Sequence, residues 1–203
     1  ATGHVKHPYK WSFAVEVKGD KTLMGMKKFA LLYPEARGYL TDWIATELCK
    51  TQDVIGLRLN FVNLEINGKN LGTYYLEERW DKRLIENNKK REGIIFRIVD
   101  GAEGADGRGD GRVDVYGLKK INSSSESYAQ LLRLDKMVKS FLNNELEPRQ
   151  IFDMEKMATI FAVSDMVEGH HAVLSRNIRF YYNPVTCLIE PIGREWEYLR
   201  KEN

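Results

Sequence analysis

The sequence predicts an α+β fold in which an antiparallel sheet comes first and helices follow. Polar and apolar residues alternate on both sides of an Asn67-Gly68 pair, which is typical of a β-hairpin. Apolar residues recur at spacings of three and four in 40–50 and 123–143, which is typical of helices. With 203 residues and 43% hydrophobic residues, the chain is long and apolar enough to form one domain with a core.

The overall composition excludes several classes of protein. A net charge of +2 gives no general attraction to nucleic acid or to an anionic membrane. Two cysteines, Cys49 and Cys187, are too few for a disulfide framework, although one bridge is allowed. We expect no membrane insertion, because no apolar run approaches the ~20 residues that a membrane helix needs. The chain starts at Ala1 without Met and shows no signal peptide, so it reads as a fragment.

Two strands are expected at the start of the chain. Residues 11–18 alternate in polarity, a Gly19-Asp20 turn follows, and 27–32 form a second short strand. Lys10 stands at the start of the first strand, and Lys28 lies in the second. From the pattern alone, both are edge-strand lysines of the kind that discourage aggregation.

A helix is predicted next, at Leu40 to Lys50, after Pro34 breaks the second strand. Arg37 lies just before this helix. Its guanidinium suits a phosphate or the carboxylate of Glu78, and a surface position is an equal alternative.

The central hairpin is the best-defined element, with strands at 59–66 and 71–76 around the turn. Its returning strand delivers the acidic pair Glu77-Glu78. This pair is either a solvated strand end or a carboxylate held rigidly at the edge of a cleft. Asp81 then caps a helix that runs to Asn87.

A short apolar strand at 94–99 precedes a glycine-rich segment, Asp100 to Asp114. We expect this segment to be a mobile loop. Its acids would suit Ca²⁺, as in a calcium-responsive adhesin, but the spacing of an EF-hand is absent.

Two helices and a hairpin are predicted for the rest of the chain. The helices are 123–143 and 154–167, the second with Asp153 as its N-cap. The side chains expected to face inward in the second helix are Met157, Ile160, Phe161 and Ser164.

The final hairpin pairs a strand at 177–182 with a return strand at 187–192. His170 and His171 precede it. A zinc site at this pair would lack clear third and fourth ligands.

Three stretches of the chain resemble one known family. The central piece NGKNLGTYYLEERWDKRLIE, the earlier KWSFAVEVKGDKTLMGMKKFALLYPEARGYLTDW and the later NIRFYYNPVTCLIEPIG occur in the order found in the CotH kinase family, which is named for a spore-coat protein. The resemblance covers nearly the whole chain and is weakest at 100–128 and in the last ten residues.

The resemblance implies a kinase-like, two-lobed fold and the use of ATP and Mg²⁺. The first lobe would be an antiparallel sheet at about 1–99, and 115–203 would form a mainly helical lobe with the terminal hairpin. Lys10 and Lys28 would hold the nucleotide phosphates, and Glu78 would position a lysine or meet the adenine side of the cleft.

The resemblance also places the chemistry near the end of the chain. Asn177 and Glu195 would coordinate the metal, and His171 would lie near the acceptor hydroxyl. The family has aspartates where this chain has His171 and Glu195. The chain is therefore either a kinase that phosphorylates Ser or Thr of a coat or envelope protein, or a pseudokinase-like structural or binding module of the spore coat or cell envelope. The same resemblance favours a secreted or envelope location.

Overall fold

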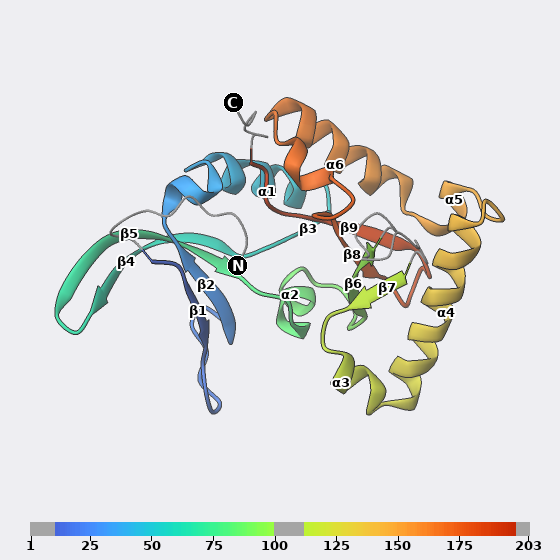
Figure 1. Ribbon diagram of the computed structural model, residues 1–203, viewed down its shortest axis with the longest axis horizontal. Helices are drawn as coiled ribbons and strands as arrows, with labels where there is room; N and C mark the ends of the chain where they lie inside the picture. Colours follow the sequence, from blue (N-terminus) through green and yellow to red (C-terminus); the bar gives the residue numbers. More distant parts are fainter. Residues whose placement is uncertain (1–10, 100–111, 198–203) are drawn as a thin grey trace, which may run out of the picture.

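The computed structural model describes residues 11–99 and 112–197 and contains two β-sheets. The first sheet has the order β1-β2-β5-β4 and is entirely antiparallel; its strands are β1 (Phe13–Glu16), β2 (Lys28–Leu32), β4 (Leu59–Ile66) and β5 (Lys69–Glu78). The second has the order β3-β9-β8-β6-β7; its strands are β3 (Ile55–Gly56), β6 (Ile94–Val99), β7 (Arg112–Val115), β8 (Arg179–Tyr182) and β9 (Ile189–Gly193). Figure 1 shows the two sheets beside each other, so the predicted α+β class is confirmed.

Helices flank both sheets. They are α1 (Thr41–Thr51), α2 (Lys82–Asn87), α3 (Leu118–Asn122), α4 (Ser125–Leu142), α5 (Pro148–Ile151) and α6 (Met154–Met166), with 3₁₀ turns η1 (Pro34–Arg37) and η3 (His170–Val173). Helix α1 packs against α6, and α4 lies along the β6–β7 side of the second sheet (Figure 1). None of the described helices is both long and apolar enough to cross a membrane.

The central hairpin forms as predicted. Asn67 and Gly68 have φ values of 52° and 76°, the two positive angles that a tight type I′ turn needs. The helix caps are confirmed as well: a side-chain oxygen of Asp81 accepts from the Arg83 amide at 2.7 Å, and one of Asp153 accepts from the Lys156 amide at 3.2 Å.

The two faces of the first sheet have different neighbours. In β5, Tyr75 points into a core shared with Ile95 and Tyr181 of the second sheet. Tyr74 points the other way, into a smaller core with Phe29. Because side chains alternate along a strand, the face of Tyr75 is the one that meets the second sheet.

The second sheet differs in detail from the expectation of a mainly helical lobe. β6, which we assigned to the first lobe, pairs with β8, and the sheet has five strands, of which β3 and β9 are parallel. β7 lies at the end of the segment that we predicted to be a mobile loop; residues 100–111 of that segment, with most of the acids considered as an alternative calcium site, lie outside the described residues. In α6, Phe161 is 47% exposed, so its predicted inward orientation is wrong.

Candidate functional site

A cavity of about 570 Å³ lies between the first sheet and the β6–α3 side of the second. Its lining includes Lys28 of β2, Trp80 of the β5–α2 connection, Gly93 before β6, and Tyr116 and Lys120 around the start of α3. Its volume falls within the ~300–1,000 Å³ of small-molecule sites. The cavity therefore has the size of a small-molecule site and lies between the two sheets.

Aromatic rings line part of this cavity. The ring centroids of Trp80 and Tyr116 are 5.4 Å apart. The second sheet reaches them with two arginines: Arg179 Nε donates to the Tyr116 hydroxyl at 2.6 Å, and Arg194 Cζ lies 5.0 Å from the centre of the Trp80 ring. The rings offer flat apolar surface to a base, and the guanidiniums place positive charge beside it.

Lys28 lies in the same lining and is available to a ligand. Its side chain is 50% exposed, and among the described residues its nearest carboxylate oxygen, on Glu16, is 3.9 Å from Nζ. A solvated pair at this distance contributes little to stability. The ammonium can therefore exchange Glu16 for a phosphate oxygen.

Glu78, the acid that we singled out, lies on the opposite face of the sheet from Lys28. It pairs across the strands with Phe29, whereas its neighbour Glu77 pairs with Ala30. Its carboxylate forms an ion pair with the Arg58 guanidinium and accepts a hydrogen bond from the Arg58 backbone amide at 3.0 Å. Its partner is therefore an arginine rather than the lysine that the resemblance implied. Glu77 is the acid on the face of Lys28. Lys10 lies outside the described residues.

Glu77 belongs to a buried ionic cluster centred on Arg37. Arg37 is only 3% exposed, and its Nε lies 2.6 Å from a Glu77 oxygen. Its two terminal nitrogens reach Glu195, at 3.1 Å, and Glu197. Glu195 is also bound by the neighbouring Arg194. The surface position that we considered for Arg37 is therefore excluded, and its carboxylate partner in β5 is Glu77.

The charges of this cluster stabilise one another. Burial disfavours every charge in it, but Arg37 and Arg194 outweigh that cost for Glu77 and hold the pKa of its carboxyl below the usual range. Burial lowers the pKa of Arg194 to about 10, with Glu77 opposing the shift and Arg37 adding to it. Both arginines thus remain charged at neutral pH.

Asp42 joins the cluster to the end of the described chain. It is 1% exposed. Its carboxylate accepts a hydrogen bond from the Tyr75 hydroxyl at 2.6 Å and another from the Trp196 backbone amide at 2.9 Å. Burial raises the pKa of Asp42 to about 6, Arg37 opposes this shift, and Glu77 adds to it. Asp42 therefore fixes the segment that carries Glu195 against the first sheet.

His171 and Asn177 lie next to the same cluster. Asn177 Nδ2 donates to the His171 carbonyl at 3.0 Å. Burial lowers the pKa of His171, and the charges of Arg37 and Arg194 lower it further against the opposing effect of Glu197. A neutral imidazole can accept a proton. His171 Nδ1 is buried and makes no hydrogen bond within residues 11–99 and 112–197.

Of the residues expected at the site, Glu195 belongs to the cluster, His171 lies close enough for the cluster's charges to shift its pKa, and Asn177 contacts the backbone of His171. Lys28 is connected to them through the cavity, since Trp80 lies between the cavity and Arg194. In the part of the chain that the structure describes, no three His, Cys, Asp or Glu side chains are grouped as a metal site, and the zinc alternative gains no support.

Several cavity and cluster residues were missed from sequence: Arg194, Arg179, Tyr116, Trp80 and Glu77. Alternation separates Glu78 from Glu77 but does not say which face the second sheet covers, so it gave only a partial signal for Glu77. Glu77 is two residues from Tyr75 in β5, so both side chains lie on the face of the first sheet that the second sheet covers. The arginines and aromatics carry no comparable local signal, because their contacts join distant elements.

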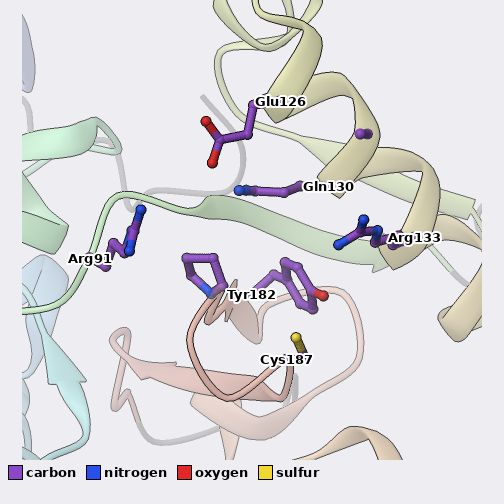
Figure 2. A pocket seen from close by; sticks show the side chains of 8 residues that line it. Arg91, Glu126, Gln130, Arg133, Tyr182 and Cys187 are labelled. Atoms are coloured by element: carbon purple, nitrogen blue, oxygen red, sulfur yellow. The ribbon is translucent and has the colours of Figure 1, made fainter.

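A second cavity, of about 350 Å³, lies between α4 and the β8–β9 turn. Figure 2 shows Arg91 and Arg133 on opposite sides of it, with Gln130 and the Tyr182 ring between them. Cys187 lies at its edge and is exposed, whereas Cys49 is buried; both thiols are free, so the single bridge that composition allowed is absent. None of the expected site residues lines this cavity.

Comparison with known proteins agrees with the order of motifs in the sequence. The model of the family described as CotH kinase protein matches residues 3–186. That range includes Lys28, the central hairpin, His171 and Asn177, and it ends before β9 and Glu195. No curated protein matches the chain. Because the match covers most of its 203 residues, the chain belongs to the CotH kinase protein family.

Proposed function

We propose that this domain binds ATP in the interlobe cavity and transfers its terminal phosphoryl group to a Ser or Thr hydroxyl of a coat or envelope protein. The observation that carries this proposal is the cavity of about 570 Å³, which combines an aromatic pair with a weakly paired lysine. Membership of a kinase family supports the choice of a nucleotide over other ligands of that size.

Within this proposal the nucleotide lies along the cavity. The base stacks on Trp80 and Tyr116, because an aromatic ring offers a flat apolar contact to any base. The phosphates meet Lys28, a compact positive charge with three donors. Arg194, stacked over Trp80, adds a second positive charge at this wall.

The acceptor hydroxyl belongs near His171. This imidazole is neutral at pH 7, so it can take the proton that the hydroxyl loses as the new P–O bond forms. Asn177 holds the backbone of His171 through its side-chain amide. Phosphoryl transfer depends mainly on positioning and on charge stabilisation, and both arginines of the cluster contribute charge.

Mg²⁺ fits this site less well than ATP does. We expected Asn177 and Glu195 as its ligands, but Oε1 of Glu195 is bound by Arg37 and Arg194. A metal that supplied Lewis-acid charge at this position would have to replace two guanidinium contacts. No step of the proposed reaction is therefore assigned to the metal.

The second candidate function is a binding module that keeps the cleft without phosphoryl transfer. The engagement of Glu195 by two arginines favours it, as do His171 and Glu195 at positions where the resemblance implies aspartates.

One experiment separates the two functions. Affinity for ATP and transfer of labelled phosphate to a Ser-rich protein are measured for the wild type, for Lys28→Ala and for Lys69→Ala, an exposed lysine at the hairpin turn. The kinase requires binding and transfer that Lys28→Ala weakens at least ~10-fold and Lys69→Ala leaves unchanged. Binding without transfer supports the module, and the absence of both refutes the nucleotide site.

A further inference from the structure

Three carboxylates converge on the guanidinium of Arg37, and this arrangement bears on which cation the site uses. They come from β5, as Glu77, and from the segment after β9, as Glu195 and Glu197. A group of acids drawn from separate elements can hold a divalent metal, although these three, placed around the guanidinium, do not form a metal site as they stand. Here its centre is filled by a side chain of the same chain.

Arg37 is fixed in this position. Its side chain is 3% exposed, and Nη1 also donates to the Ala36 carbonyl at 3.2 Å. All three nitrogens of the guanidinium have carboxylate partners. A planar guanidinium with five N–H donors suits several carboxylates at once, and removing it would leave buried negative charge uncompensated.

A second arginine carries positive charge from this cluster to the nucleotide cavity. Arg194 is 5% exposed, binds Glu195 and stacks over Trp80, which lines the cavity. Arg194 itself does not line the cavity; the cations that can meet the phosphates are those of the lining, namely Lys28, Lys82, Arg83 and Lys120. The charge that a metal would otherwise neutralise is therefore balanced by protein side chains.

We propose that Arg37 is the resident cation of this carboxylate cluster, and that the cleft consequently binds a nucleoside phosphate without a divalent metal. The second half of this inference rests on the proposed nucleotide site, and the first half does not.

The first half is tested with Mn²⁺ alone, without nucleotide. Mn²⁺ is titrated into the wild type, Arg37→Met, Arg37→Lys and Arg149→Met, a control that alters an exposed arginine of α5. Free Mn²⁺ is followed by electron paramagnetic resonance and the unfolding midpoint by circular dichroism. We expect no saturable binding up to ~1 mM in the wild type, Arg37→Lys and Arg149→Met. Arg37→Met should bind Mn²⁺ and show a higher midpoint when Mn²⁺ is present, because a ligand that binds only the native state stabilises it.

Two results would overturn this half: Mn²⁺ binding by the wild type with a Kd below ~0.1 mM, or a folded Arg37→Met variant that gains no affinity. If Arg37→Met folds only when Mn²⁺ is added, the metal replaces the guanidinium and the proposal holds. If it folds in neither condition, the wild-type titration tests the proposal by itself: saturable Mn²⁺ binding by the wild type would overturn it, and the absence of such binding would support it.

The second half is tested by titrating ADP into the wild type with excess Mg²⁺ and then with EDTA. We expect the two Kd values to agree within about threefold; a Kd at least 10-fold weaker in EDTA would show that a metal is required, a difference of about 1.4 kcal/mol. Absence of ADP binding in both buffers would refute the nucleotide site and the second half together. The Mn²⁺ titrations would still decide the role of Arg37.

Discussion

The Nε atom of Arg37 lies 2.6 Å from a carboxylate oxygen of Glu77, and the side chains are 3% and 2% exposed. The pair joins the turn before α1 to the last part of β5, 40 residues later. Since Arg37 also binds Glu195 and Glu197, this contact ties the first sheet to the segment after β9. The stability of the fold and the geometry of the cleft thus depend on the same residues.

Arg37→Met should lower the free energy of unfolding by about 3–5 kcal/mol at pH 7, because the substitution leaves buried carboxylates without their cation. Urea unfolding followed by circular dichroism measures the change. Arg149→Met, at a residue whose side chain is 77% exposed, should change it by less than ~0.5 kcal/mol. Equal stabilities of the two variants would contradict the interpretation of Arg37 as a buried clamp.

Asp42 should make stability depend on pH in the acid range. Its pKa is about 6 in the folded protein and about 3.9 in an unfolded chain, so the folded state holds its proton more tightly. The stabilisation from protonated Asp42 is complete below pH 4 and is lost as the pH rises from 4 to 6. The contribution of Glu77 to the pH dependence has the opposite sign, because a carboxyl whose pKa is lowered by folding adds stability that is lost as the pH falls.

The contribution of Asp42 is isolated by comparison with Asp42→Asn. Between pH 4 and pH 6.5, the wild type should lose roughly 1–3 kcal/mol of stability relative to this variant. Urea unfolding of both proteins at steps of half a pH unit measures the difference. A difference that stays constant over the whole range would show that Asp42 does not titrate there.

Trp80→Leu should weaken ADP binding ~10-fold, because a base loses its stacking surface while the side chain stays apolar. Isothermal titration measures the affinity. Trp43→Leu is the matched control, since Trp43 is 39% exposed on α1 and does not line the cavity. Equal losses in the two variants would point to a general effect on folding rather than to a ring in the site.

The elements that sequence predicted well are those determined by local interactions. The hairpin depends on period-two polarity and on two residues, Asn67 and Gly68, that tolerate positive φ. At each of the caps, Asp81 and Asp153, the carboxylate accepts a hydrogen bond from a backbone amide two or three residues later in the chain. These features need no knowledge of the rest of the fold.

The site was harder to predict, because its contacts are between residues far apart in the chain. Arg37 and Glu195 are separated by 158 residues, and β6 pairs with β8, more than 80 residues later. The choice between Glu77 and Glu78 depended on which face of the first sheet the second sheet covers. Alternation alone gives two faces and does not say which of them is buried against a partner.

Gly93 should be the glycine least tolerant of a side chain next to the proposed nucleotide site. A Cβ there would clash with the Tyr182 carbonyl oxygen and lie 2.7 Å from Tyr181 Cε2. Because one of these neighbours is backbone of β8, Gly93→Ala should cost about 2–3 kcal/mol of stability and weaken ADP binding. Gly68→Ala, where the added Cβ meets nothing within 4 Å, should cost about 1 kcal/mol through its positive φ and leave binding unchanged. Thermal unfolding and ADP titration of both variants measure these effects. A Gly93→Ala variant with wild-type stability and affinity would mean that β6 and β8 can separate at this point, contrary to the close contact that forms one side of the cavity.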